Sequence, residues 1–294
     1  MKKFGLIGNP IAHSMSPALF KAAYSSTDGQ DGSPEFIYEL IEGADFEASY
    51  KKFTEEYDGI NVTAPFKEKA FAKAVIKSPE CQKTGATNLL VKTPEGIRAY
   101  NSDYSGILLS LLEALHPEKK LKDLYSAITA RSIDKPSGLS ALVTGCGGAG
   151  KAAAVAAGDL GLSVTLINRT VSKAEAIAAA LPEYGFKVRR QEDFRQCFKE
   201  ADIVIYTLPG PVEGIYELTG DDFSTRSGYG KILLEANYKD PAFTPWILSG
   251  IQAANPEFKY IPGKKWLLYQ AYTGYGLFTG KAPDLEAMTQ VFGQ

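Results

Sequence analysis

The sequence predicts an α/β protein built from two domains. With 294 residues, the chain is longer than a domain with a single hydrophobic core usually is. Its content of 45% hydrophobic and 22% charged residues is typical of a globular protein. Residues 139–170 read as a strand, a glycine turn, a helix and a second strand, and residues 3–24 read as a strand, a turn and a helix. Strands that alternate with helices in this way indicate parallel sheets.

Charge and hydropathy argue against two classes of partner, nucleic acids and membranes. The formal net charge is −2 and no run of Lys or Arg builds a local basic field, so we expect no nucleic-acid partner. No apolar stretch approaches the roughly 20 residues of a membrane span. Residues 1–3 lead into a segment that reads as a strand, at the place where a signal peptide would have its apolar region. We therefore expect a cytoplasmic protein without a membrane partner.

Cysteine and histidine usage narrows the possible chemistry. The three cysteines, Cys81, Cys146 and Cys197, are odd in number and widely scattered, which predicts reduced packing residues and no disulfide framework. His13 and His116 are the two histidines, so we expect no metal site. A general acid or base is then expected to be a lysine or an aspartate.

The N-terminal half begins with an apolar strand at residues 3–7. Residues 13–17 then open a helix that runs to about residue 24, with Ser16 as the N-cap and Pro17 at the first helical position. The next elements are a strand at 35–41, a helix at 45–56, a short strand at 59–63, a helix from Lys67 to about residue 76, strands at 89–92 and 97–100, and a helix at 105–115. The Gly and Ser residues at 25–33 predict a loop.

Polar side chains lie at one end of four of these strands, where the strand gives way to a loop or helix and where open α/β sheets bind ligands. They are Ser14 and Ser16, then Asn61, Thr63 and Lys67, then Asn88, then Asn101 and Asp103. Taken singly, Ser16 and Asp103 read equally well as helix caps. As a set, these groups can surround a small polyhydroxylated ligand. Lys67 lies in a first helical turn, where the helix dipole disfavours a cation, and Lys67 with Asp103 provides a proton-transfer pair.

The second half opens with a glycine-rich turn between a strand at 141–144 and a helix at 151–160. Gly145, Gly147 and Gly150 form a G-x-G-x-x-G fingerprint, which allows a tight turn, close approach of a pyrophosphate and close packing of the helix on the strand. The helix N-terminus favours the anion. This pattern predicts a dinucleotide site.

The residues after the next strand, at 163–167, indicate which dinucleotide binds. NAD-binding proteins usually present an acidic residue there, whereas this chain has Asn168, Arg169 and Thr170. A guanidinium and a hydroxyl suit a 2′-phosphate, so the sequence favours NADP(H). The alternative is that Arg169 is a surface residue at a strand end.

The remaining elements continue the alternation. We expect a helix at 172–181, a strand at 187–190, a helix at 193–198, strands at 202–206 and 232–235, a helix from residue 265 and another after Pro283. Residues 224–230 predict a loop. Residues 114–136 read as an insertion that forms a surface loop or an extra helix, and residues 118–135 offer no apolar stripe to bury.

Seven motifs in order along nearly the whole chain resemble the shikimate dehydrogenase family: HSMSP, NVTAPFK, GATN, NSDYSG, GCGGAG, NRTVSKAEAIA and QAYTGYGLFTG. The resemblance implies reversible, NADPH-dependent reduction of 3-dehydroshikimate to shikimate on the route to chorismate and the aromatic amino acids. Relatives usually continue the strand at 202–206 with Asn-Ala-Thr. Tyr206, Thr207, Leu208, Pro209 and Gly210 depart from that pattern, which leaves the cofactor contacts of this loop open.

The resemblance also implies roles for individual residues. Lys67 would be the catalytic acid and base, and Asp103 would pair with it and hold substrate hydroxyls. Substrate contacts would come from Ser14, Ser16, Asn61, Thr63, Asn88, Tyr238 and Gln270. Cofactor contacts would come from Gly145, Gly147, Gly148, Ala149, Gly150, Asn168, Arg169, Thr170, Lys173, Ala236 and Gly263.

The resemblance further implies the domain organisation. Residues 1–104, completed by 265–294, would form a substrate-binding α/β domain, and residues 105–264 a Rossmann-type NADP-binding domain, so that the C-terminal helices return to the first domain. We expect a monomer or homodimer acting on a small molecule. Two alternatives remain: a quinate/shikimate dehydrogenase with dual substrate use, and a ligand-sensing homologue without catalysis.

Overall fold

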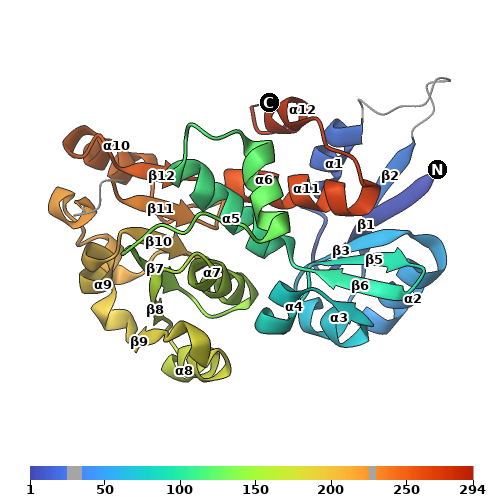
Figure 1. Ribbon diagram of the computed structural model, residues 1–294, viewed down its shortest axis with the longest axis horizontal. Coiled ribbons are helices and arrows are strands. Elements are labelled where there is room, and N and C mark those ends of the chain that lie inside the picture. Colours follow the sequence, from blue (N-terminus) through green and yellow to red (C-terminus); the bar gives the residue numbers. More distant parts are fainter. Residues whose placement is uncertain (25–34, 225–229, 294) are drawn as a thin grey trace. The chain divides into compact units, whose positions relative to one another are not determined.

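The structure, a computed structural model, describes residues 1–24, 35–224 and 230–293. The chain divides into two compact units, one of Met1–Gly106 with Leu267–Gln294 and one of Ile107–Trp266. The divisions fall inside two helices, α5 (Ser102–Leu115) and α11 (Gly263–Thr279) (Figure 1). The loops expected at 25–33 and 224–230 lie, except for Ser224 and Gly230, outside the described residues.

The first unit is built on a six-stranded mixed sheet in the order β2-β1-β3-β5-β6-β4. Its strands are β1 (Lys2–Gly8), β2 (Phe36–Glu42), β3 (Gly59–Val62), β4 (Ile76–Lys77), β5 (Leu89–Thr93) and β6 (Gly96–Tyr100). Its other helices are α1 (Ser16–Tyr24), α2 (Phe46–Glu56), α3 (Lys67–Lys73), α4 (Pro79–Thr84) and α12 (Leu285–Gln290). β1 runs parallel to β2 and β3, whereas β5 runs antiparallel to β3 and β6.

The strand register brings the four polar strand ends to one edge of this sheet. Ile7 is paired with Val62, so the chain leaves β1 and β3 at the same level. Asn61 lies opposite Leu89, and Leu89 lies opposite Tyr100, so β5 begins and β6 ends at this level too. The segments after β1, after β3, before β5 and after β6 therefore start side by side.

The core of the first unit packs aromatic side chains between the sheet and its helices. Phe4 of β1 stacks on Phe278 of α11 with ring centroids 4.6 Å apart, and both are almost fully buried. Gly59 allows this contact, because a Cβ there would lie 2.7 Å from the Phe278 ring. The return of the C-terminal helix to the first sheet thus rests on apolar burial.

Three expectations for the first unit are wrong in detail. The helix from Lys67 ends at Lys73, because residues 76–77 pair with β6 as strand β4 and α4 follows. Helix α1 begins at Ser16, so Ser16 is its first residue and not its N-cap. Helix α5 begins at Ser102, which places Asp103 inside the first turn.

The second unit is a fully parallel six-stranded sheet in the order β12-β11-β10-β7-β8-β9. Its strands are β7 (Ser140–Thr144), β8 (Ser163–Ile167), β9 (Lys187–Arg189), β10 (Ile203–Tyr206), β11 (Ile232–Glu235) and β12 (Lys259–Ile261). Its helices are α6 (Leu121–Ala130), α7 (Gly148–Asp159), α8 (Val171–Ala180), α9 (Phe194–Glu200) and α10 (Pro245–Ala254), with short 3₁₀ turns between them. Strand order reverses between β7 and β10, as in doubly wound nucleotide-binding sheets.

The second unit contains elements that the sequence pattern did not predict. Helix α10 and strand β12 lie between the strand expected at 232–235 and the helix expected from residue 265, where no element was expected, and β12 pairs with β11 over three residues. Helix α6 lies inside the insertion at residues 114–136, for which a surface loop or an extra helix was expected. The expectation that the insertion lacks an apolar stripe is wrong, because Leu124 is buried and Leu121 and Ile128 on the same side of α6 are half-buried.

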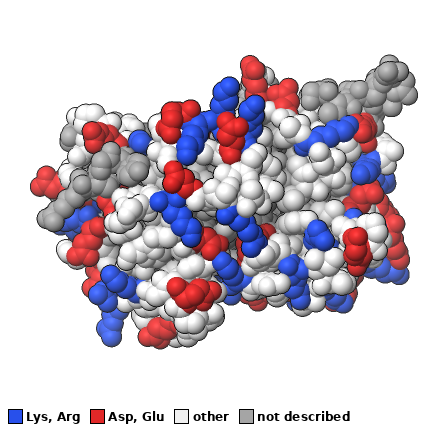
Figure 2. Space-filling view, in the orientation of Figure 1, with Lys and Arg blue, Asp and Glu red and all other residues white. Residues whose placement is uncertain are grey.

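The surface carries charges of both signs. On the face drawn in Figure 2, Lys and Arg side chains lie interspersed with Asp and Glu side chains over the described residues. Within those residues, no helix is both long and apolar enough to cross a membrane.

The three cysteines are buried and unpaired, as predicted. Burial raises the pKa of the Cys81 thiol to about 12 and that of Cys146 to about 11, and it also raises the pKa of Cys197. At pH 8 the thiolate fraction of Cys146 is then about one in a thousand.

We expect a thiol-reactive disulfide reagent at pH 8 to modify none of these cysteines within minutes in the folded protein, and all three after unfolding in guanidinium. The absorbance of the released chromophore counts the modified thiols. Rapid modification of one thiol in the folded protein would contradict the burial.

Candidate active site

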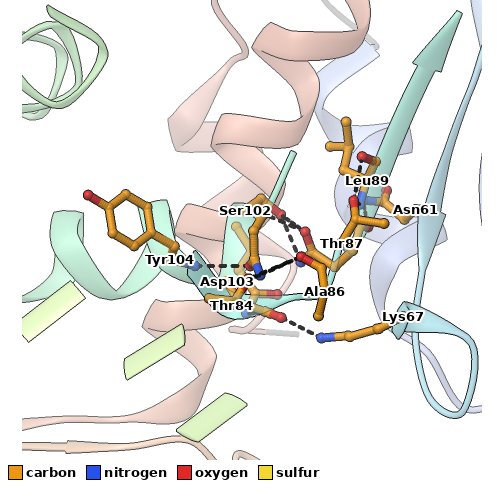
Figure 3. Close-up of polar contacts among 12 residues, drawn as sticks. Asn61, Lys67, Thr84, Ala86, Thr87, Leu89, Ser102, Asp103 and Tyr104 are labelled. Atoms are coloured by element: carbon orange, nitrogen blue, oxygen red, sulfur yellow. Dashed lines mark hydrogen bonds and ion pairs between the residues drawn. The ribbon is translucent and has the colours of Figure 1, made fainter. Parts of the chain in front are cut away.

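Two side chains from distant parts of the sequence meet on the carboxylate of a third residue, Asp103, in the first unit. The Lys67 ammonium, at the start of α3, forms an ion pair with Oδ2 of Asp103, 36 positions away. Gln270 of α11 donates from Nε2 to the other oxygen, Oδ1, over 2.6 Å. In Figure 3 the Lys67 side chain reaches across to Asp103 from a different part of the unit. The structure thus brings together the predicted proton-transfer pair.

The burial of this pair is unequal. The Lys67 side chain is 22% exposed and that of Asp103 is 8% exposed. Asp103 lies in the first turn of α5, where the helix dipole stabilises a carboxylate, and its charge offsets the unfavourable position of Lys67 in the first turn of α3. A lysine ammonium has three protons and the ion pair requires one, so Lys67 can also donate to the oxygen of a ligand.

The position of Asp103 is set by amide side chains around the start of α5. Asn88 accepts from the backbone N–H of Ser102 through Oδ1 over 2.7 Å and donates from Nδ2 to the Ser102 hydroxyl over 3.0 Å. Asn101 accepts from the backbone N–H of Tyr104 at 3.3 Å, so Asn101 and not Asp103 makes the capping bond at the start of α5. The interpretation of Asp103 as an N-cap is therefore wrong, and its carboxylate is available to Lys67 and Gln270.

The serine pair lies just after β1. The backbone N–H of Ser16 donates to Ser14 Oγ, and the Ser14 hydroxyl donates to Ser16 Oγ, each over 3.2 Å. Both residues are half-buried. Because Ser14 takes up an amide of the first helical turn, the Ser16 hydroxyl is not needed for capping.

Asn61 and Thr63 flank the end of β3. Asn61 donates from Nδ2 to the backbone oxygen of Asn88 over 3.3 Å and accepts from the Tyr38 hydroxyl over 2.8 Å. Thr63 lies against the end of β1, since a Cβ on Gly8 would be 2.4 Å from its methyl group. Tyr38 was not predicted as a site residue. Alternation along β2 predicts the face of the sheet on which Tyr38 lies, but it does not predict that the side chain extends past β1 to β3.

Helix α11 brings Gln270 to this edge of the sheet by a close approach at Gly274, one turn further along. A Cβ on Gly274 would lie 3.3 Å from a methyl group of Leu89 and 3.9 Å from Nδ2 of Asn61. Residues four apart share one face of a helix, so the face of Gly274 that packs on the sheet also presents Gln270.

The glycine loop of the second unit has the geometry that its sequence predicts. Gly145 has φ +91°, which favours glycine, and a Cβ on Gly150 would lie 1.9 Å from the Gly145 carbonyl oxygen. Gly147 precedes α7, and a Cβ there would meet no atom within 4 Å. Gly147 and Gly148 are exposed and Ala149 is half-buried, so the N-terminus of α7 is open to an anion.

Asn168 connects the glycine loop to the end of β8. Its Oδ1 accepts from the backbone N–H of Cys146 over 3.1 Å, and its Nδ2 donates to the Thr170 carbonyl over 2.8 Å. Arg169, Thr170 and Lys173 are exposed beside it. The charge of Lys173, with that of Lys151, partly counters the effect of burial on the pKa of Cys146, so positive charge lies close to the loop.

The loop after β10, which departs from the family pattern, forms hydrogen bonds within itself and lies against the glycine loop. Thr207 donates from its hydroxyl to the Thr144 carbonyl over 2.6 Å, and this hydroxyl oxygen would be 2.7 Å from a Cβ on Gly145. The Tyr206 hydroxyl donates to the Gly210 carbonyl over 2.7 Å. Asn237 adds a bond to the Pro209 carbonyl over 2.9 Å.

The turn after β11 is held by a buried carboxylate that sequence reasoning missed. Glu235 is fully buried and accepts from the backbone N–H groups of Ala242 and Phe243 and from the Tyr260 hydroxyl. Burial raises the pKa of Glu235. The half-buried Tyr238 lies within the turn that these bonds close.

Gly263 starts α11 directly against β11. A Cβ there would lie 2.4 Å from the Ala236 carbonyl oxygen, so only glycine fits. Ala236, Tyr238 and Gly263 belong to the second unit, whereas Lys67, Asp103 and Gln270 belong to the first.

The reversed strand order, the glycine loop and the open α7 N-terminus define a dinucleotide-binding α/β protein with a separate polar site in its other unit. The family model described as "Shikimate dehydrogenase substrate binding domain" matches residues 6–90, and the one described as "Shikimate / quinate 5-dehydrogenase" matches residues 127–211. Shikimate dehydrogenase (NADP(+)) of Haloarcula marismortui is 37% identical over 98% of this chain and 97% of that protein. The chain belongs to the shikimate dehydrogenase family.

Two further relatives differ in how much of their length the chain spans. It covers 17% of the pentafunctional AROM polypeptide of Candida tropicalis, at 29% identity over 95% of this chain. The crystal structure of shikimate 5-dehydrogenase from Thermus thermophilus, in complex with NADP(H) and shikimate, matches 99% of this chain and 98% of its own with a TM-score of 0.72 and 28% identity.

We expect Gly150→Ala to lower the free energy of unfolding by more than about 2 kcal/mol, because the new methyl group meets backbone that cannot move aside without opening the loop. Gly147→Ala is the matched control, since its methyl group would enter open space, and should cost about 1 kcal/mol or less. Urea denaturation followed by circular dichroism measures both. Equal losses in the two variants would contradict the loop geometry.

Proposed function

We propose that this chain is a shikimate dehydrogenase, which reversibly reduces 3-dehydroshikimate to shikimate with NADPH on the route to chorismate and the aromatic amino acids. The contact of Lys67 and Gln270 with the two oxygens of Asp103 is the observation that carries the proposal. Family membership alone would also fit a homologue that binds ligand without catalysis. Lys67 is a cation that can give up a proton, and its ion pair with Asp103 among polar strand ends favours a catalytic protein over a homologue that only binds ligand.

In this proposal Lys67 delivers a proton to the carbonyl oxygen of 3-dehydroshikimate and recovers it from the hydroxyl of shikimate in the reverse direction. Asp103 keeps the ammonium in place and accepts from substrate hydroxyls, and Gln270 fixes the carboxylate. The burial of Asp103 strengthens these charge-assisted bonds.

The surrounding polar groups suit the rest of the substrate. Ser14 and Ser16 offer two hydroxyl donors, which suit a carboxylate, and Asn61, Thr63 and Asn88 offer amides and a hydroxyl that suit ring hydroxyls. Tyr238 would contact the substrate as well.

NADP(H) fits the second unit. The backbone at Gly145, Gly147, Gly148, Ala149 and Gly150 and the N-terminus of α7 would hold the pyrophosphate, because the space beside Gly147 is open. Arg169 and Thr170, with Asn168 and Lys173 beside them, would hold the 2′-phosphate, and Ala236 and Gly263 would contact the remainder. When bound, NADPH supplies the hydride.

The proposal extends to the setting of the enzyme. Three buried, unpaired thiols agree with a reducing compartment, and we place the enzyme in the cytoplasm. We propose that it works as a monomer or homodimer, since one chain supplies all the residues named above.

A turnover assay tests the proposal. Loss of NADPH absorbance with 3-dehydroshikimate, and its gain with shikimate and NADP⁺, should be fast, whereas quinate with NAD⁺ should be a poor pair. Equal use of quinate would establish dual substrate use. Binding of shikimate without any turnover would establish a sensing homologue.

We expect Lys67→Ala to lower kcat by about 10²- to 10⁴-fold, the usual contribution of a positioned general acid. The affinity for NADPH, measured by fluorescence titration, should stay within about two-fold, because the glycine loop lies in the other unit. Lys69→Ala, at an exposed position of the same helix, is the control and should keep wild-type kcat. A Lys67→Ala enzyme with near-normal kcat would remove Lys67 from the mechanism.

We expect Arg169→Ala to raise the KM for NADPH by about 10- to 100-fold, as the loss of charge-assisted bonds to a phosphate predicts. The KM for NADH, which lacks the 2′-phosphate, should change less than about three-fold. Steady-state rates at saturating 3-dehydroshikimate measure both values. An equal rise for the two cofactors would place the 2′-phosphate elsewhere.

A further inference from the structure

The Tyr38 hydroxyl lies between two parts of the polar site, and the motifs assign it no role there. It donates to Asn61 Oδ1 over 2.8 Å, and the nearby Ser16 side chain partly counters the effect of burial on the pKa of Tyr38. Ser16 in turn accepts from Ser14 over 3.2 Å. The Tyr38 hydroxyl therefore lies between the serine pair after β1 and the amide on β3.

The directions of the two bonds at Asn61 follow from chemistry. The Asn88 carbonyl oxygen can only accept, so the Asn61 atom facing it is the Nδ2 donor and Oδ1 is turned to Tyr38. Tyr38 has a single hydroxyl proton, which it gives to Oδ1. The Tyr38 oxygen can then only accept from any other hydroxyl.

The Tyr38 side chain is held rigidly. Its ring stacks on Phe20 with centroids 4.3 Å apart and planes 10° from parallel, and its backbone is paired with Phe4 in the register of β1 and β2. Burial raises the pKa of Tyr38, so the hydroxyl keeps its proton at neutral pH. The hydroxyl is thus a fixed donor toward Asn61.

We propose that Tyr38 is a positioning residue for substrate binding: it fixes the Asn61 amide with Nδ2 as the donor group offered to a ligand hydroxyl. This inference rests on the proposed function, in which Asn61 contacts the substrate. Because the Tyr38 proton is committed to Asn61, the Ser14 and Ser16 hydroxyls can turn toward a substrate carboxylate without loosening the amide. The serine pair adapts to the ligand while the amide stays fixed.

Tyr38→Phe tests the inference, because it keeps the stacked ring and removes only the hydroxyl. The KM for shikimate should rise about three- to ten-fold, the usual weight of one hydrogen bond, with kcat within about two-fold. Tyr57→Phe is the matched control: its hydroxyl donates over 2.7 Å to Glu39, the next residue along β2, away from the polar edge. It should leave both constants unchanged, and thermal unfolding should show that both variants fold.

A double-mutant cycle with Asn61→Ala shows whether Tyr38 acts through Asn61. If it does, Tyr38→Phe should change the KM by less than about 1.5-fold once Asn61 is removed, and isothermal titration with shikimate should show the same loss of effect. A full effect in that background, or a Tyr38→Phe enzyme identical to the Tyr57→Phe control, would overturn the inference. A wild-type enzyme that neither binds nor turns over shikimate would overturn the proposed function instead.

Discussion

The ion pair of Lys67 with Asp103 is the contact on which the polar site depends. Two helices begin at the same edge of one sheet, one with a cation and the other with an anion in its first turn. A lysine at a helix start is unfavourable by itself, and the carboxylate makes it acceptable. Asn88 and Asn101 hold the start of α5 so that the carboxylate faces Lys67 and not its own backbone.

Much of the fold could be predicted because local patterns agree with tertiary packing. The strands at 163–167 and 232–235 have the expected bounds, since each is an apolar run between clear breaks. Strand β4 could not be predicted, because two residues become a strand only by pairing with Arg98 and Ala99 of β6. Strand β12 depends in the same way on β11.

The candidate site divides along a similar line. Lys67, Asp103 and Gln270 could be named from motifs, and their meeting could be expected from strand ends that share an edge. The exchange of capping roles between Asp103 and Asn101 follows from a helix that begins at Ser102, three residues before its expected start at residue 105, and sequence patterns do not fix helix ends this closely. Tyr38 and Glu235 escaped notice because their hydrogen-bond partners are set by strand register and by a turn that closes in three dimensions.

The two bonds of Asn168 limit how the cofactor preference of this chain could change in evolution. A carboxylate at this position, as in enzymes that use NAD, would still accept from Cys146 but could not donate to the Thr170 carbonyl. The glycine loop and the end of β8 would then lose part of their connection. The side chains of Arg169 and Thr170 are exposed and do not connect the loop to the strand. Substitutions at those two positions could therefore change the cofactor preference toward NAD while the glycine loop stays intact.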